Sequence, residues 1–224
     1  MSQNLRNAFN QTEQYVVDLI YEGLEVVHKV FNKHGIRYTL SGGSLLGLVR
    51  HQGLIPWDDD ADVMFLQDDF YRILRLEDEF KENGYKTCTK TYEKWGAIKL
   101  YPEHGLKMLS GHDDYKHPGI DLFPIKPIND KLLHFSQKTA QNIWPNEYIF
   151  INEWKKIDAQ RFGDITVLAL AKNDAHRYLR VSYGDNYMTH AIKTFDHHAE
   201  KEILAHELIL SDFKCAYHSR YLKK

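Results

Sequence analysis

Four aspartates in one short segment are the first feature of this sequence that could do chemistry. Asp58, Asp59 and Asp60 precede the apolar run ADVMFL (61–66), and Asp62 lies within it. If the segment is extended, Asp58, Asp60 and Asp62 share one face and Asp59 points to the other. Three like charges on one face repel, whereas a divalent cation keeps them all ionised. The spacing therefore predicts a site for Mg²⁺ or Mn²⁺, which prefer oxygen ligands.

Two other interpretations compete with a metal site at these aspartates. A solvated acidic loop is the simpler one, but the acids adjoin VMFL, an apolar run that must enter a core and draw them to its edge. An EF-hand loop would need a glycine where Val63 stands and a bidentate glutamate where Asp69 stands. The sequence therefore argues against both.

A glycine turn upstream of the aspartates could bind a phosphate. Gly42, Gly43 and Ser44 follow a short β-prone segment and open a predicted helix. In that position, backbone N–H groups and the positive end of the helix dipole can face an anion. The Ser44 hydroxyl either binds the phosphate or caps the helix, and glycine turns before helices also serve as packing devices.

Three further residues have candidate roles at the same site. Arg50 either holds a diphosphate with its planar guanidinium or forms a surface ion pair with Asp58 or Asp59. Lys99 is either a phosphate ligand or a solvent-facing lysine on an alternating strand. Asp121 is either a third carboxylate of the site or a strand-edge acid bonded to a turn.

The elements that must position these residues combine strands with helices. Helical periodicity begins after Asn10 and Glu13, which read as a capping box, and continues to Gly35. A second helix is expected over about 68–83, and from Lys126 onward the pattern predicts mainly helix, including 175–181 and 199–210. Short strands are expected at 36–42, 61–66, 85–90, 96–101, 106–110 and 119–125, with a hairpin turn at 102–105. The implied fold is α+β, a mixed sheet with flanking helices and a C-terminal helical cap.

Length and composition favour one domain over residues 1–224, with a core at about 36–125 and a helical part at about 126–224. The 29 Lys and Arg nearly balance the 31 Asp and Glu, so no overall charge would attract nucleic acid. Cys88 and Cys215 lack metal-ligand spacing, which favours a reducing, cytoplasmic setting. No signal peptide or transmembrane stretch is visible, and His197 with His198 is expected to cap or flank a helix.

The segment SGGSLLGLVRHQGLIPWDDDADVMF (41–65) closely resembles the signature of the LicD family, which includes bacterial phosphocholine transferases and fukutin-related ribitol-phosphate transferases. Three other segments are similar to further blocks of the family: WGAIKLYPEHG (95–105), GIDLFPI (119–125) and YLRVSYGDNYM (178–188). The resemblance spans about Tyr38–Met188, and within it 129–172 matches only in general character.

This resemblance implies a nucleotidyltransferase-like fold that cleaves a CDP-linked alcohol, passes the phospho-alcohol to a glycan or glycolipid hydroxyl and releases CMP. Asp60 and Asp62 match the family's Asp-x-Asp pair, Asp121 matches its third carboxylate, and Asp58 matches the acid before the pair. Asp60 and Asp62 are expected to bind one or two metal ions, and Asp121 to bind a second ion or to take the acceptor proton. A nucleotidyltransferase that releases pyrophosphate and a non-catalytic metal- and nucleotide-binding relative remain as alternatives.

Overall fold

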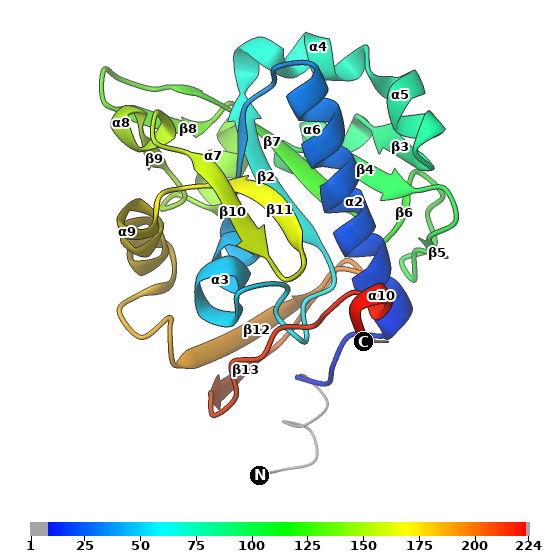
Figure 1. The fold of residues 1–224 in the computed structure, drawn as a ribbon, viewed down its shortest axis with the longest axis vertical. Helices are drawn as coiled ribbons and strands as arrows, with labels where there is room; N and C mark the ends of the chain where they lie inside the picture. The colour runs from blue at the N-terminus through cyan, green and yellow to red at the C-terminus, as the bar shows by residue number, and fades with distance from the viewer. Residues whose placement is uncertain (1–8, 223–224) are drawn as a thin grey trace.

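A mixed β-sheet forms the centre of the protein (Figure 1). The computed structural model describes residues 9–222 of the chain. β2 runs parallel to β7, and the other neighbouring strands are antiparallel. The strand order is β1 (Tyr38–Leu40), β2 (Ala61–Leu66), β7 (Ile120–Pro127), β4 (Ile98–Pro102) and β3 (Tyr85–Cys88), and β8 (Leu132–Phe135) and β9 (Ile149–Phe150) continue the sheet from β7.

Helix α2 (Gln14–Lys33) lies across one face of this sheet (Figure 1). The two elements approach closely at Gly23, where an added Cβ would lie only 3.0 Å from Cγ1 of Ile120 on β7. Ile120 therefore points toward α2. Because side chains alternate along a strand, its neighbour Asp121 points to the opposite face of the sheet.

The start of α2 differs from the expected capping box. The N-cap is Glu13, without a side-chain cap, so the prediction that places Asn10 at the cap is wrong. The physical reason lies in Thr12, whose N–H donates to Pro56 O at 2.8 Å and whose hydroxyl donates to Asp58 O at 2.7 Å. These two bonds hold the chain before α2 against the aspartate segment instead of within the helix.

Shorter helices and two-stranded pairs surround the sheet. The helices are α3 (Gly42–His51), η1 (Gln67–Asp69), α4 (Phe70–Leu74), α5 (Glu77–Glu82), α6 (Lys90–Trp95), α7 (Lys138–Ile143), α8 (Ile151–Trp154), α9 (Lys172–Tyr183) and α10 (Ser219–Leu222). The pairs are β5 (Leu106–Lys107) with β6 (Lys116–His117), β10 (Asp158–Phe162) with β11 (Ile165–Ala169), and β12 (His190–Asp196) with β13 (Lys201–Ile209). The expected α+β class, a mixed sheet with flanking helices, is confirmed.

The C-terminal part is not the expected helical cap. Helix α9 covers the predicted helix at 175–181, but the predicted helix over 199–210 is wrong, because β13 occupies it. The apolar spacing of this segment is compatible with either a helix or a strand. β13 pairs along its length with β12, and this pairing makes the segment a strand. The turn at 102–105 forms, yet the strand after it pairs with β6, so no hairpin joins it to β4.

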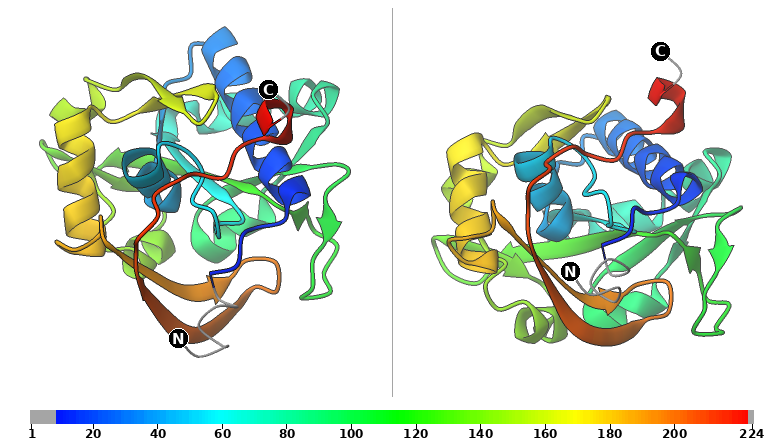
Figure 2. Two further views of the ribbon diagram at one scale, coloured as in Figure 1. Left: turned by 60° about the horizontal axis from the view of Figure 1, so that its bottom comes forward. Right: turned by 90° about the horizontal axis from the view of Figure 1, so that it is seen from below.

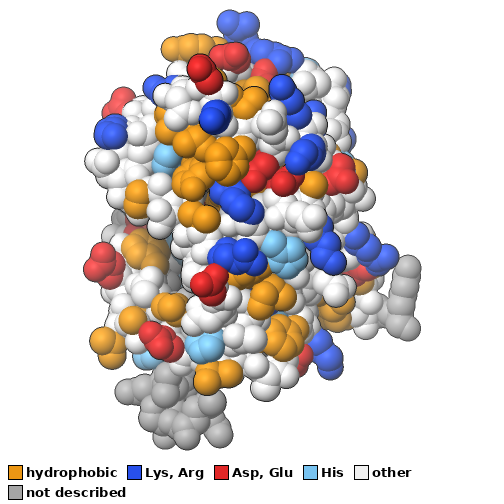
Figure 3. All heavy atoms as spheres, turned by 90° about the vertical axis from the view of Figure 1, so that its left-hand side faces the viewer, with side chains coloured by type: hydrophobic (Ala, Val, Ile, Leu, Met, Phe, Trp, Pro, Cys, Tyr) orange, Lys and Arg blue, Asp and Glu red, His pale blue; other side chains and the backbone are white. Residues whose placement is uncertain are grey.

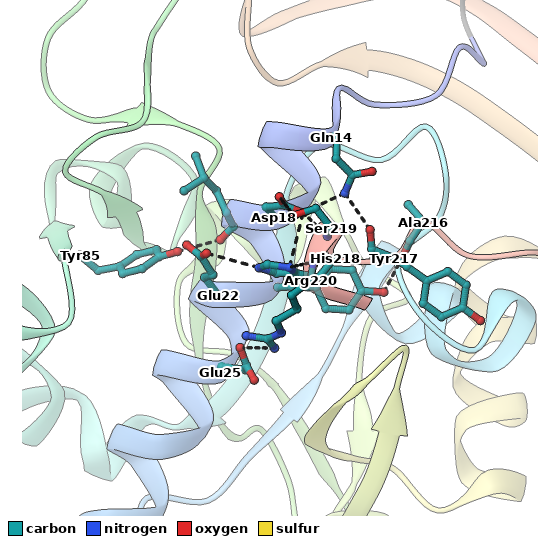
Figure 4. A network of polar contacts seen from close by, with 12 residues as sticks. Gln14, Asp18, Glu22, Glu25, Tyr85, Ala216, Tyr217, His218, Ser219 and Arg220 are labelled. Carbon is teal, nitrogen blue, oxygen red and sulfur yellow. Dashed lines mark hydrogen bonds and ion pairs between the residues drawn. The ribbon is translucent and has the colours of Figure 1, made fainter. Parts of the chain in front are cut away.

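The chain after β13 returns past α3 and ends beside α2 (Figures 2 and 4). Ala216 forms an isolated bridge with Leu54, its N–H donating to Leu54 O at 2.9 Å. Asp18 of α2 accepts the N–H of Ser219 at 2.7 Å and its hydroxyl at 2.6 Å. This segment thus ties α2 to the connection between α3 and β2, which contains the aspartates.

The face of the molecule that bears α8 and α9 has a mixed surface (Figure 3). Hydrophobic side chains gather in its upper half, beside side chains of both charge signs. That face therefore offers no continuous basic track of the kind that follows a nucleic-acid backbone. Among the residues described, no helix is long and apolar enough to cross a membrane.

Candidate active site

Three neighbouring strands place a row of charged side chains on the sheet face away from α2. The register pairs Asp62 of β2 with Asp121 of β7, and Asp121 with Lys99 of β4. Lys99 Nζ donates to Asp121 Oδ2 at 2.7 Å, and both side chains are buried. Lys99 is therefore not the solvent-facing lysine that its alternating strand allowed. Gly119 makes room for it, because a Cβ there would lie 2.2 Å from Lys99 Cδ.

Asp60 joins this row from just before β2. Asp60, Asp62 and Asp121 each offer an oxygen within 4.8 Å of the other two. Asp121 Oδ1 is buried and, among the described residues, has no hydrogen-bond partner. A buried carboxylate oxygen without a partner is costly unless something else satisfies it. Three converging carboxylates with one such oxygen fit a divalent cation such as Mg²⁺ or Mn²⁺.

The pKa values of these groups reflect their crowding. Burial, together with the charges of Asp60 and Asp121, raises the pKa of Asp62 well above its ordinary value. Burial also raises the pKa of Asp60. For Lys99, burial opposes the charged form, but the carboxylates of Asp121 and Asp60 outweigh it and raise the pKa. A bound cation would reverse the shifts of the acids by stabilising their charged forms.

The expected alternation of the aspartates holds in part: Asp58, Asp60 and Asp62 border one cavity and Asp59 does not, although regular strand begins only at Ala61. Asp59 still contacts the site through a histidine, because its Oδ1 lies 2.8 Å from His197 Nδ1, and His197 Nε2 lies 3.3 Å from Asp60 Oδ2. Burial favours a protonated Asp59, yet the bond from His197 outweighs it and lowers the pKa to about 2. Asp58 completes this second group, whose atoms also lie within 4.8 Å of one another.

His197 was expected beside a helix, but it lies in the turn between β12 and β13. The same turn is fixed to the segment around β5 and β6. Glu200 accepts hydrogen bonds from Ser110 Oγ at 2.8 Å and from the Tyr115 hydroxyl, and His198 contacts Lys107 O at 2.8 Å. The β12–β13 turn therefore forms a wall of the site that is anchored on two sides.

The glycine turn at the start of α3 lies directly against the acids. A Cβ at Gly42 would lie 3.0 Å from Asp62 Oδ2, and one at Gly43 would lie 3.0 Å from Asp58 Oδ2. Ser44 does not cap the helix, since Ser41 stands at the N-cap and the Ser44 hydroxyl accepts the Asp62 N–H at 2.9 Å. The turn thus lets carboxylates approach the positive end of the helix dipole.

Arg50, on the last turn of α3, is buried. Its Nη1 donates to Tyr187 O at 2.9 Å and His190 O at 3.0 Å, and its Nε donates to His51 Nε2. Within residues 9–222 no carboxylate lies within ion-pair distance of it, so of the two alternatives for Arg50 the surface pair with Asp58 or Asp59 is wrong. Burial lowers the Arg50 pKa to about 10 against the charge of Asp58.

Most of these residues border one cavity of about 980 Å³. The acid row, Arg50, Lys99 and the two glycines form one side of it, and β12 and the turn that follows it form another. A space of this size accommodates a nucleotide-sized ligand. Ser44 is not among the residues that line the cavity.

Gly42→Ala is expected to weaken metal binding. Gly42 has φ +50°, so alanine would strain the backbone by about 1 kcal/mol, and its Cβ would also push Asp62 aside. Gly35→Ala is the matched control, because Gly35 has φ +63° but open space at its Cβ. Both variants should lose similar stability without metal, whereas only Gly42→Ala should lose the rise in Tm produced by Mg²⁺. Equal rises in the two variants would contradict this account.

Comparisons with known proteins agree with the geometry. Residues 35–169 match the family described as LicD/FKTN/FKRP, nucleotidyltransferase domain. An uncharacterized protein of Rickettsia typhi is 28% identical over 148 residues, which cover 66% of this chain and 40% of that protein. The lipopolysaccharide cholinephosphotransferase LicD of Haemophilus influenzae is 43% identical over 51 residues, covering 23% of this chain and 19% of the relative. Human ribitol 5-phosphate transferase FKRP is 42% identical over 62 residues, covering 27% and 10%. The chain thus spans less than half the length of each relative.

Proposed function

Because the chain belongs to the LicD/FKTN/FKRP nucleotidyltransferase-domain family, we propose that it is a metal-dependent phosphotransferase. It moves a phospho-alcohol from a CDP-linked donor to a hydroxyl of a glycan or glycolipid and releases CMP. The relatives named as cholinephosphotransferase and ribitol 5-phosphate transferase support this class of reaction. The observation that carries the proposal is the convergence of Asp60, Asp62 and Asp121, together with a buried Asp121 Oδ1 that has no hydrogen-bond partner in residues 9–222.

In this proposal the acids hold the metal and the basic residues hold the donor. Asp60, Asp62 and Asp121, with Asp58 beside them, would hold a divalent cation, which would supply positive charge to the non-bridging phosphate oxygens. Lys99 bears an ammonium group beside Asp121 in the wall of the same cavity. Phosphoryl transfer depends mainly on positioning and charge neutralisation, which such residues provide.

Arg50 and the glycine turn complete the donor site in the proposal. The Arg50 guanidinium bonds only neutral acceptors among the described residues and lines the cavity, so an anionic diphosphate would be its first charged partner. The Gly42 N–H is already donated to the Tyr178 hydroxyl at 3.2 Å, so in this proposal the backbone contact with phosphate comes from Gly43. Ser44 acts indirectly, by fixing Asp62 through its backbone N–H.

The direct test is to incubate the purified protein with Mg²⁺ and either CDP-choline or CDP-ribitol and to measure CMP release. Slow hydrolysis is expected even without an acceptor, because water can reach the cavity. Mg²⁺ should also raise Tm, since binding to the native state alone adds about 2.7 kcal/mol at a hundredfold excess over Kd. Pyrophosphate release from nucleoside triphosphates would identify a nucleotidyltransferase instead. A Tm unmoved by metal and donor, with no product, would point to the non-catalytic alternative.

A further inference from the structure

The carboxylate of Glu147 is in the cavity wall and belongs to neither group of acids. Glu147 lies in the loop between α7 and β9 and lines the cavity. The Tyr178 hydroxyl donates to Glu147 Oε2 at 2.7 Å while it accepts the Gly42 N–H. A Cβ at Gly42 would lie 3.0 Å from Asp62 Oδ2 and 3.8 Å from Glu147 Oε2. Glu147 therefore stands close to the acid row, because its carboxylate and that of Asp62 approach the same point beside Gly42.

Glu147 differs from Asp60 and Asp121 in its partners. Asp121 is paired with Lys99, and Asp60 lies against His197. In the described part of the chain, Glu147 has no basic partner, and Tyr178 is the one side chain that donates to it. A carboxylate without a nearby cation holds a proton more strongly than a paired one. Burial accordingly raises the Glu147 pKa to about 7, although the Tyr178 bond acts in the other direction.

The proposed reaction needs a group with this property. When an acceptor oxygen bonds to the phosphorus that bears the alcohol, the P–O–P bridge of the donor breaks. CMP leaves with the bridging oxygen and its electron pair, and the acceptor hydroxyl must give up its proton. A base is most effective when its pKa lies near the working pH, and it must not be neutralised by a cation. Asp121 does not meet the second condition, because Lys99 Nζ is bonded to its carboxylate.

We propose that Glu147 is the catalytic base that takes the proton of the acceptor hydroxyl, and that Tyr178 is the positioning residue that orients its carboxylate. This inference rests on the proposed function. It assigns proton removal to Glu147 and leaves Asp121 to the metal and Lys99. The charged and titratable groups that face Glu147 are Tyr178 and Tyr183 of α9 and Asp62 of β2.

The direction in which kcat changes with pH follows from the protonation state in which Glu147 is active. Glu147 accepts a proton only as carboxylate, so kcat should rise with pH through its pKa and then level off. The Tyr178 hydroxyl lowers that pKa by bonding to the carboxylate. Tyr178→Phe should therefore move the rising limb of the profile to higher pH, whereas a structural role of Tyr178 would change rates without moving the limb.

The experiment uses the full chain with Mg²⁺ and whichever of CDP-choline and CDP-ribitol the wild type hydrolyses. Glu147→Gln is expected to lower kcat at least about a hundredfold, with KM within about threefold and with the Mg²⁺-dependent rise in Tm retained. Glu202→Gln is the matched control, because Glu202 is an exposed carboxylate of the same cavity on β13. With alcohols as acceptors, the defect should be smaller for trifluoroethanol than for ethanol, since the more acidic hydroxyl needs less help from a base.

Three outcomes would overturn the assignment of Glu147. They are a Glu147→Gln variant with nearly wild-type kcat, loss of the metal-dependent Tm rise in that variant, and a Tyr178→Phe profile whose limb does not move upward. The Tyr178→Phe profile decides alone if Glu147→Gln does not fold. Failure of the wild type to cleave either donor would instead refute the proposed function, so the two failures can be told apart.

Discussion

Asp60→Asn, Asp62→Asn and Asp121→Asn are each expected to lower the turnover of a CDP-linked donor at least about a hundredfold while the protein stays folded. Asparagine keeps the shape of aspartate but removes the charge that holds the cation. The loss of transition-state stabilisation should be on the order of 3 kcal/mol or more. CMP release at saturating donor and Mg²⁺ measures the effect, and circular dichroism checks the fold.

Without metal, the melting temperatures of these three variants should differ from one another. The pKa values of Asp60 and Asp62 are raised in the folded state, so their charged forms oppose folding at neutral pH. Asp62→Asn should therefore melt no lower than wild type without metal, and its advantage should grow as pH rises above the ordinary aspartate range. Asp60→Asn should gain less, because it also removes the carboxylate that lies 3.3 Å from His197 Nε2. Asp121→Asn should melt lower, because it removes the partner of the buried Lys99.

Two neighbouring aspartates provide controls for this series. Asp68 is exposed beyond the far end of β2, so Asp68→Asn should keep nearly full activity. Asp59 binds the ring of His197 and does not line the cavity, so Asp59→Asn should have a smaller effect than the three acids above. If Asp62→Asn releases CMP at nearly the wild-type rate, or if Asp59→Asn is as damaging as Asp60→Asn, the metal assignment is wrong.

Much of the fold could be predicted because its central elements have unambiguous local patterns. The apolar periodicity of α2 and the buried runs that became β2 and β7 appear at the expected places. The segment that became β13 is different. Its apolar residues Ile203, Leu204, Leu208 and Ile209 are spaced as a helix would space them, and only pairing with β12 makes the segment a strand. That pairing is a tertiary interaction, so it cannot be recognised from a short stretch of sequence alone.

Candidate residues of the site could be predicted from the sequence only where they lie within one short, contiguous motif. Asp60 and Asp62 stand in one short segment, and the resemblance to the LicD family linked them to Asp121. The register that sets Asp62 beside Asp121 requires the strand order. His197 and Glu147 come from a hairpin turn and a loop far away in the sequence, without a motif around either residue. A single sequence gives no signal that would bring such residues to the acids.

Lys99→Met should be the most damaging change among the basic residues, with kcat lowered by about two to three orders of magnitude. The variant loses the ammonium group beside the reacting phosphate in the proposed site. It also leaves Asp121 buried without its partner, which should cost about 3 kcal/mol in the metal-free protein. Mg²⁺ should restore part of that stability, because a cation at Asp60, Asp62 and Asp121 replaces the missing charge. Denaturant titrations with and without Mg²⁺ measure both effects.

The control for Lys99→Met is Lys94→Met, because Lys94 lines the same cavity but is exposed and lies 6.0 Å over the Trp95 ring. It should retain activity within about threefold, since a solvent-exposed cation–π contact contributes little. Gly119→Ala should reproduce part of the Lys99→Met defect, because its Cβ would occupy the path of the Lys99 side chain. The double variant Gly119→Ala with Lys99→Met should then be no less active than Lys99→Met alone. If the two effects instead add, Gly119 does not act through Lys99, and the path assigned to the lysine is wrong.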